Sequence, residues 1–230
     1  MRQGTRLNTS HHSSGQQKVI LLGAGGHAKV LLDTLQLSGI TMDGVSDPGF
    51  GKTEKLWRGI AVLGDDNDVL QMNPAEVVLV NGVGSLPGQG LRQQVFRKFK
   101  ESGFGFLNVI HPFSAIGTGV ETGEGFQVMA GAVIQADSRI GSNVIVNTGA
   151  LIDHDCQIGC HTHIAPGAVL SGGVTVGHGC HIGTGASVVQ GVSIGLGSVI
   201  GAGTVVVKNV PEGSVLMGQP PQPARKFFTE

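Results

Sequence analysis

The feature that most constrains this chain is a six-residue repeat that starts at Ile110 and runs to Val206 without an insertion. Sixteen of the 17 residues at its first position are aliphatic, the residue four places later is mostly small, and Gly gathers at the second and fourth positions. A fixed short period of this kind indicates a solenoid of stacked strands. The first-position residues are Ile110, Ile116, Thr122, Val128, Ile134, Ile140, Val146, Ile152, Ile158, Ile164, Leu170, Val176, Ile182, Val188, Ile194, Ile200 and Val206.

The repeat predicts a triangular prism in which each hexapeptide supplies one short strand and one corner. The aliphatic residue points inward, the small residue fits near the corner, and Gly permits the turn without a Cβ clash. Three repeats make one coil, so residues 18 apart stack in one column, and the segment holds a little over five coils. Each coil covers only its neighbours, so the ends need caps. The Pro-rich tail from Pro211 is expected to stop the coil and close one end.

Composition limits the remaining choices. Gly makes up 39 of 230 residues, but an apolar fraction of 40% is too high for a flexible linker. A net charge of −1 without a basic tract argues against nucleic acid as the main partner. No apolar run is long enough for a membrane span, and the polar first 17 residues lack the apolar core of a signal peptide. Three Cys, an odd number, suit a reducing cytoplasm.

The region before Ile110 has a different pattern, in which apolar strand-like runs alternate with helical spacing. This alternation predicts a small parallel α/β sheet, about half of a full dinucleotide-binding fold. Strands are expected at residues 19–22, 40–46, 60–63 and 76–81, and helices at 29–37, 65–71 and 89–102.

A glycine-rich turn follows the first expected strand. Gly23, Gly25 and Ala28 form a G-x-G-x-x-A pattern that opens a helix, where backbone N–H groups can approach a phosphate. Asp47 ends the second expected strand and can hold a ribose or a base. The alternative is a tight strand-to-helix turn without a ligand. A complete NAD site is not expected, because the second mononucleotide-binding half is missing.

Histidines are concentrated in the repeat. His154 occupies the third position of its hexapeptide, is expected to point outward near a corner, and lies between Asp153 and Asp155. A histidine so placed can act as a base, with either carboxylate fixing its tautomer. The alternative is a set of solvated histidines on a polar face, which is the interpretation we favour for His178 and His181.

A metal site is the less favoured interpretation of the cluster Cys156, Cys160, His161 and His163. Cys156 falls at the small inward position, and zinc-binding spacing such as C-x₂-C is absent. Cys180 also falls at an inward position, in a different column, so no disulfide is expected.

The hexapeptide repeat and three further segments carry a family resemblance. The repeat from Ile110 to Val206 resembles the left-handed parallel β-helix acyltransferases. The segments Leu22-Gly-Ala-Gly-Gly-His-Ala-Lys29, Val146-Asn-Thr-Gly-Ala150 and Ile152-Asp-His-Asp-Cys156 narrow the match. Together they resemble bacterial sugar N-acetyltransferases of the bacillosamine and perosamine type, in the sialic acid O-acetyltransferase-like group. The resemblance covers residues 18 to about 225. It implies an α/β N-terminal half-Rossmann domain followed by a left-handed parallel β-helix, and the handedness comes from the resemblance alone.

The resemblance implies a homotrimer whose active sites lie between adjacent prisms, with acetyl-CoA as cosubstrate and no metal. His154 matches the catalytic base and Asp155 its acidic neighbour, although Asp153 stays open as a rival. The residues assigned to acetyl-CoA are His163, Gly172, Gly173, Ile182 and Gly201. The residues assigned to the nucleotide-linked sugar are Gly25, Gly26, His27, Asp47 and Asn147.

The implied reaction moves acetyl from acetyl-CoA to the 4-amino group of a UDP- or GDP-linked 4-amino-4,6-dideoxy sugar, for bacterial surface glycan synthesis. The sequence does not decide between UDP and GDP. The alternatives are an O-acetyltransferase acting on sialic acid or another sugar hydroxyl, a zinc enzyme resembling carbonic anhydrase, and a scaffold without activity. The expected organisation is a disordered lead or tag at 1–17, an α/β domain at 18–107, the β-helix at 108–210 and a cap at 211–230.

Overall fold

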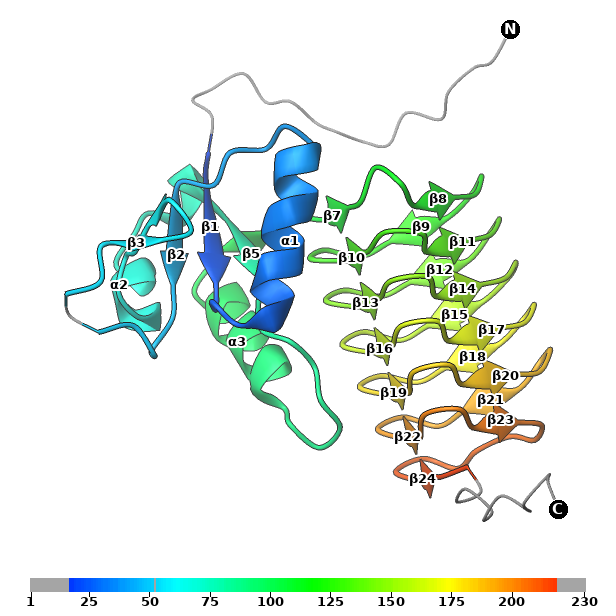
Figure 1. Cartoon of the computed structure of the whole chain (residues 1–230). Helices are drawn as coiled ribbons and strands as arrows, with labels where there is room; N and C mark the ends of the chain where they lie inside the picture. Colours follow the sequence, from blue (N-terminus) through cyan, green and yellow to red (C-terminus); the bar gives the residue numbers. More distant parts are fainter. Residues whose placement is uncertain (1–16, 52, 219–230) are drawn as a thin grey trace, which may run out of the picture.

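The computed structural model describes residues 17–51 and 53–218, which form an α/β unit beside a triangular prism (Figure 1). The predicted lead lies outside the described residues except for Gln17, and so do residues 219–230 of the predicted cap. Within the described ranges, no helix has both the length and the apolar character needed to cross a membrane.

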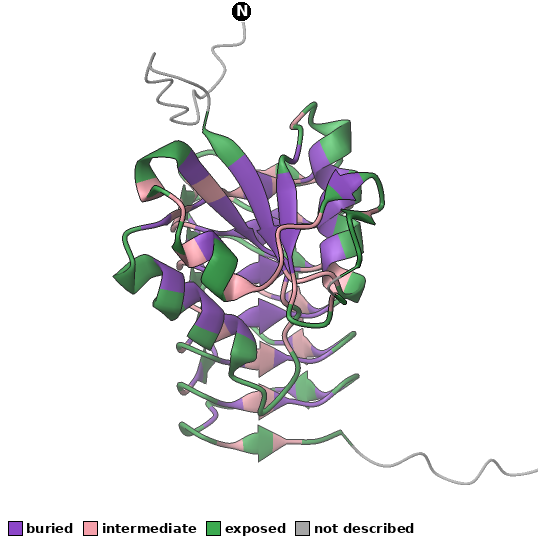
Figure 2. Ribbon diagram, turned by 90° about the vertical axis from the view of Figure 1, so that its left-hand side faces the viewer, coloured by how far each residue is buried: buried purple, intermediate pink, exposed green. Residues whose placement is uncertain are grey.

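The α/β unit is a four-stranded parallel sheet between two layers of helices. The strand order is β2 (Gly44–Ser46), β1 (Lys18–Leu22), β5 (Val77–Asn81) and β6 (Gly105–Phe106). One face packs against α1 (Gly26–Leu37), and the other against α2 (Asp66–Leu70) and α3 (Leu91–Glu101). A 3₁₀ turn, η1 (Pro74–Glu76), leads into β5. The strands are buried along most of their length (Figure 2), as expected for a parallel sheet covered on both faces.

The predicted parallel sheet is confirmed, with three differences. The expected strand at 40–46 pairs only from Gly44, because the Asp43 carboxylate binds the Val19 N–H at the start of the ladder. The expected strand at 60–63 is divided: β4 (Ile60–Ala61) pairs antiparallel with β3 (Leu56–Trp57), and Val62 then makes a single parallel bridge to Val45 of β2. Strand β6 was not predicted, because a two-residue segment carries no readable period.

The prism has three parallel sheets of seven, six and five strands, about six coils in all. The seven-strand sheet comprises β7 (Val109–Ile110), β10 (Gln127–Val128), β13 (Ile145–Val146), β16 (His163–Ile164), β19 (His181–Ile182), β22 (Val199–Ile200) and β24 (Val215–Leu216). The six-strand sheet comprises β8 (Ala115–Ile116), β11 (Val133–Ile134), β14 (Leu151–Ile152), β17 (Val169–Leu170), β20 (Ser187–Val188) and β23 (Val205–Val206). The five-strand sheet comprises β9 (Glu121–Thr122), β12 (Arg139–Ile140), β15 (Gln157–Ile158), β18 (Thr175–Val176) and β21 (Ser193–Ile194).

The predicted register is confirmed. The first-position residues from Val128 to Val206 are buried and form one continuous core, which also contains Cys156 and Cys180 at the small inward positions. Neighbouring strands from β7 to β23 pair residues 18 apart, as His163 with His181, whereas the last pair, β22 and β24, joins residues 16 apart. The prediction that the coil stops at Pro211 is wrong, because β24 pairs with β22 and adds one more strand after the prolines begin.

Candidate active site

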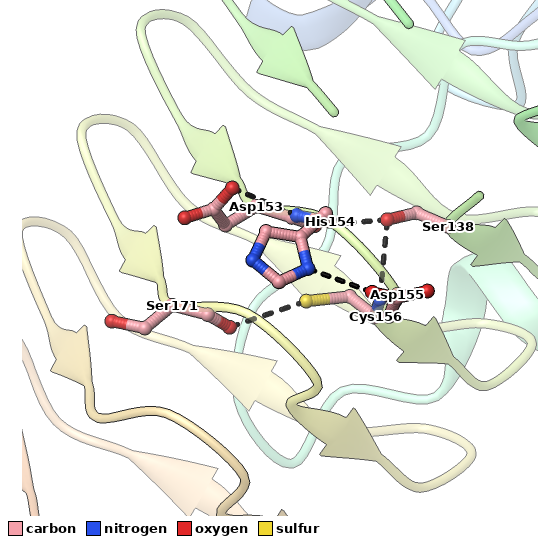
Figure 3. A network of polar contacts seen from close by, with 6 residues as sticks. All are labelled: Ser138, Asp153, His154, Asp155, Cys156 and Ser171. Carbon is pink, nitrogen blue, oxygen red and sulfur yellow. Dashed lines mark hydrogen bonds and ion pairs between the residues drawn. The ribbon is translucent and has the colours of Figure 1, made fainter. Parts of the chain in front are cut away.

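The exposed corner after β14 holds His154 with its two acidic neighbours (Figure 3). His154 Nδ1 donates to Asp155 Oδ2 at 2.7 Å, and the His154 backbone N–H donates to Asp153 Oδ1 at 2.8 Å. A carboxylate oxygen can only accept, so Nδ1 carries a proton and, in the neutral ring, Nε2 is bare. Asp155 therefore contacts the imidazole ring, whereas Asp153 contacts the backbone N–H of His154.

The local charges make His154 more basic than an ordinary histidine. The hydrogen bond to Asp155 raises the pKa of His154, and the nearby charge of Asp153 raises it further. The side chain is 55% exposed, so burial does little to oppose these effects. A bare, basic nitrogen facing solvent is suited to accepting a proton from a bound substrate.

Hydrogen bonds from Ser138 and the backbone conformation of Asp155 hold this corner in place. Ser138, one coil above, donates to the Asp153 carbonyl at 2.9 Å and accepts from the Cys156 N–H at 3.2 Å. Asp155 has a φ of +58°, in the left-handed region that Gly occupies at most corners of this prism. A non-Gly residue in this region is uncommon, and Asp is among the residues that tolerate it. The carboxylate is thus placed against His154 by a strained backbone position.

Gly172 lies directly against the His154 ring, in the next coil. A Cβ on Gly172 would lie 2.7 Å from both Cε1 and Nε2 of His154, so any larger residue would displace the imidazole from this position. The Gly173 N–H donates to the His154 carbonyl at 2.9 Å. No hydrogen bond within the described ranges uses the Gly172 N–H. The contact between His154 and Gly172 agrees with the prediction that residues 18 apart stack in one column.

The glycine-rich turn borders a cavity of about 440 Å³ in the α/β unit. Gly25 caps α1, and a Cβ on Gly25 or Gly26 would meet no protein atom within 4 Å. The N-terminal N–H groups of α1 therefore border open space, as an anion site requires. The structure brings together four of the five predicted sugar-side residues here, namely Gly25, Gly26, His27 and Asp47.

Asp47 supports this turn through its carboxylate. Its Oδ2 accepts from the Ala24 N–H at 2.7 Å and its Oδ1 accepts from the Gly49 N–H at 2.7 Å. Both oxygens are thus engaged with backbone groups, so Asp47 shapes the cavity wall in addition to lining it.

His163 and the fifth sugar-side residue, Asn147, lie elsewhere, on the seven-strand sheet of the prism. His163 Nδ1 donates to the Ser85 carbonyl at 3.1 Å, and Nε2 accepts from Asn147 Nδ2 at 3.0 Å. Burial, followed by the charge of His181, lowers the pKa of His163 to about 3. With both nitrogens occupied and the ring neutral, His163 ties the loop that contains Ser85 to the prism and has no free nitrogen to act as a base.

Two of the residues assigned to acetyl-CoA are buried in this chain. The Ile182 side chain lies wholly inside the prism core. Gly201 is buried beneath β24, where its N–H donates to the Leu216 carbonyl at 2.7 Å. The repeat places first-position residues inward. The inward direction of Ile182 could therefore have been read from the sequence pattern itself.

Sequence reasoning missed a buried polar network between the α/β unit and the prism. Its members are Asn81, Arg92, Gln127, Asn143 and His161. Asn143 and His161 both have positive φ where the repeat normally has Gly, and this departure from the pattern was the available signal. The Arg92 guanidinium faces no carboxylate in these hydrogen bonds, and burial lowers its pKa to about 9.

Within the described residues, no three His, Cys, Asp or Glu side chains lie close enough together to hold a metal ion.

Comparison with known proteins agrees with the geometry. A family model of the PglD N-terminal domain matches residues 18–99, and a model of the bacterial transferase hexapeptide (six repeats) matches residues 155–190. No curated protein matches the sequence.

Two solved structures are similar over nearly the whole chain. PerB from Caulobacter crescentus, in complex with CoA and GDP-perosamine, is 38% identical with a TM-score of 0.79, covering 87% of this chain and 94% of PerB. The acetyltransferase domain of PglB from Neisseria gonorrhoeae is 33% identical with a TM-score of 0.80, covering 91% of this chain and all of that domain. The same domain in complex with acetyl coenzyme A is 34% identical with a TM-score of 0.81.

An α/β domain joined to a left-handed β-helix, with a basic imidazole on an exposed corner, defines a hexapeptide-repeat acyltransferase. The chain belongs to the acetyl-CoA-dependent nucleotide-sugar N-acetyltransferases, the family of PerB and PglB.

Proposed function

We propose that this enzyme acetylates the 4-amino group of a UDP- or GDP-linked 4-amino-4,6-dideoxy sugar, and that His154 is its general base. The observation that carries this proposal is the exposed His154 ring, oriented by Asp155 and bare at Nε2. The GDP-perosamine bound to PerB supports an amino-sugar substrate of this class.

The reaction follows from that geometry. The sugar amine attacks the thioester carbonyl carbon, a C–N bond forms, and His154 Nε2 takes the amine proton. The tetrahedral intermediate collapses, the C–S bond breaks, and the thiolate of CoA receives a proton from the imidazolium. The products are the N-acetyl sugar and CoA, and no covalent enzyme intermediate is needed.

We propose the Gly172 N–H as the donor that stabilises the oxyanion. Gly172 packs against the His154 ring, and its N–H makes no hydrogen bond among the described residues. A backbone donor aimed at the developing charge acts only in the transition state, where such stabilisation lowers the barrier.

A homotrimer would unite the two halves of the site. The α/β unit adjoins the seven-strand sheet, whereas β14 and the corner after it lie on the other side of the prism (Figure 1). The six-strand sheet also presents exposed apolar side chains, including Leu151 at 41% and Val205 at 63% exposed. We infer that this apolar face packs between copies and brings His154 of one copy to the sugar cavity of the next.

The cell context follows from the same proposal. The three cysteines are free, which fits a reducing cytoplasm. The modified sugar would serve the synthesis of a bacterial surface glycan such as lipopolysaccharide. We also propose the limits 18–107 for the sugar-binding domain and 108–210 for the β-helix that carries His154.

The direct test is thiol release from acetyl-CoA with four acceptors: UDP- and GDP-linked 4-amino-4,6-dideoxy sugars, and the two matching 4-hydroxy sugars. Release that requires the amine supports the proposal, and the better nucleotide identifies the substrate. Release with the hydroxyl sugars and none with the amines would instead establish the O-acetyltransferase.

Gly25→Ala tests the sugar cavity separately. The new Cβ meets no protein atom within 4 Å, so the fold should survive while phosphate approach is blocked. We expect the KM for the nucleotide sugar to rise about tenfold or more and the KM for acetyl-CoA to stay unchanged. An unchanged sugar KM would contradict the assignment of this turn.

A further inference from the structure

We propose that Gln127 is a positioning residue that fixes His27 in one neutral tautomer, so that His27 offers a bare nitrogen to a hydroxyl or amine of the nucleotide sugar. This inference rests on the proposed function and adds the chemistry of one contact in the sugar cavity.

Gln127 lies at an outward position of the seven-strand sheet, yet it is completely buried beneath the α/β unit. Its Nε2 donates to the Asn81 carbonyl oxygen at 2.9 Å. A carbonyl oxygen can only accept, so the amide nitrogen of Gln127 must face Asn81. The amide oxygen Oε1 therefore faces the other way, toward His27.

The orientation of Gln127 decides where the His27 proton lies. His27 Nε2 lies 2.7 Å from Gln127 Oε1. The amide oxygen can only accept, so Nε2 must carry the proton and Nδ1 is bare. Within the described ranges, no hydrogen bond reaches Nδ1 of His27.

The Asn81 carbonyl that starts this chain is itself fixed. It also accepts from Arg92 Nη1 at 2.9 Å, and the Asn81 side chain donates to the Arg92 carbonyl at 3.1 Å and to Asn143 Oδ1 at 3.2 Å. Asn81, Arg92 and Asn143 are buried, so water cannot supply replacement partners. Turning the Gln127 amide over would place two carbonyl oxygens against each other.

The environment also keeps His27 neutral. Burial is the main cause and the charge of Arg92 the second, and together they lower the pKa of His27 to about 4 despite the bond to Gln127. At neutral pH the ring is therefore uncharged.

The bare Nδ1 of His27 determines which kind of substrate group can bind beside it. His27 is the second residue of α1 and lines the cavity beside Gly25 and Gly26, whose backbone suits a phosphate. A lone pair repels phosphate oxygens but accepts from O–H or N–H. The backbone therefore holds the phosphate, and His27 contacts a donor group of the ribose or the sugar.

The tautomer can be measured directly by long-range ¹H–¹⁵N NMR of the histidine rings in the intact protein at pH 7, with the His27 signals assigned from the spectrum of His27→Asn. We expect the proton on Nε2 in the wild type. Gln127→Met keeps the volume and removes the fixed acceptor, so the His27 signals should move toward a mixture of tautomers. Gln157→Leu, an exposed Gln at the equivalent strand position of the five-strand sheet, is the matched control.

Kinetics provide the second readout. Loss of the fixed tautomer should raise the KM for the nucleotide sugar about tenfold, with kcat and the KM for acetyl-CoA changed by less than about twofold. A proton on Nδ1 in the wild type, a charged ring at pH 7, or unchanged tautomer and sugar KM in Gln127→Met would overturn the inference. Inactivity toward every amino sugar would overturn the proposed function instead, and the NMR result on the wild type would still decide this inference.

Discussion

The two histidine-rich regions of this molecule use the same side chain in opposite ways. At the exposed corner, His154 is hydrogen-bonded to a carboxylate and its pKa is raised. Between the α/β unit and the prism, burial is the main cause that lowers the pKa of His27 and His161 to about 4 and that of His163 to about 3. The partners there are amides and carbonyls rather than carboxylates.

The difference teaches what each environment permits. A solvent-facing imidazole with a carboxylate partner can take up and release a proton, whereas a buried imidazole bonded to neutral groups stays uncharged and serves as a directional hydrogen-bonding group. The corner therefore performs the proposed proton transfer, and the interface holds the loops around the sugar cavity in position.

The largest expected effect comes from His154→Ala. Removing the proposed base should lower kcat at least about a hundredfold, because general-base loss typically costs about 10²–10⁴ in rate. Acetyl-CoA binding, checked by calorimetry, and the assembled mass should not change. His178→Ala is the matched control, since His178 is an exposed histidine on another corner and its loss should be nearly silent. Full activity of His154→Ala near pH 7 would remove the corner from the mechanism.

A second prediction displaces the imidazole without deleting it. Gly172→Ala places a Cβ 2.7 Å from the His154 ring, which must swing away. We expect kcat to fall about tenfold or more, because a misplacement of about 1 Å can cost up to about a hundredfold. The melting temperature should change little, since the exposed ring can move into solvent. Equal losses of activity and stability would show that Gly172 serves the fold alone.

Asp155→Asn should have a smaller effect of a different kind. Asn tolerates the left-handed conformation found at Asp155, so the corner should keep its shape. Losing the carboxylate should lower the pKa of His154, and kcat at pH 7.5 should fall less than in His154→Ala. An NMR titration of the histidine rings reads the pKa directly. Asp153→Asn, which alters the backbone contact, should shift it less, and a larger shift in Asp153→Asn would reverse the roles of the two carboxylates.

The smallest expected effect concerns acid stability. His163 has a folded-state pKa of about 3, so below about pH 6.5 the unfolded chain binds a proton that the folded chain does not. Stability should therefore fall as the pH drops from about 6.5 toward 3, by up to about 1.4 kcal/mol per pH unit for this one group.

His163→Gln should make that acid dependence shallower, as measured by urea unfolding at pH 7.5 and pH 5. His154→Gln should act in the opposite direction, because a raised pKa contributes stability at low pH that is lost as the pH rises. An acid dependence in His163→Gln as steep as that of the wild type would contradict the assignment of His163 as a neutral buried group.

The prism and the exposed corner that holds His154 were predictable from sequence, because the repeat fixes both the position and the direction of each side chain. The spacing of 18 residues places His154 over Gly172, and the third position of a hexapeptide points outward. The interface was not predictable, because Gln127 occupies an outward strand position and only the docked α/β unit buries it. The bonds from His27 to Gln127 and from Asn81 to Asn143 join residues 100 and 62 positions apart, which no local pattern reveals.

The most direct test of the account is the pH dependence of kcat/KM for the amino sugar. A base must be unprotonated, so activity should fall as the pH drops through the pKa of the base. If His154 is that base, the wild type should lose activity with a midpoint above the ordinary histidine value of about 6.5, and the midpoint should move to lower pH in Asp155→Asn. A midpoint near pH 4 that is unmoved in Asp155→Asn would contradict the account and point to one of the buried interface histidines.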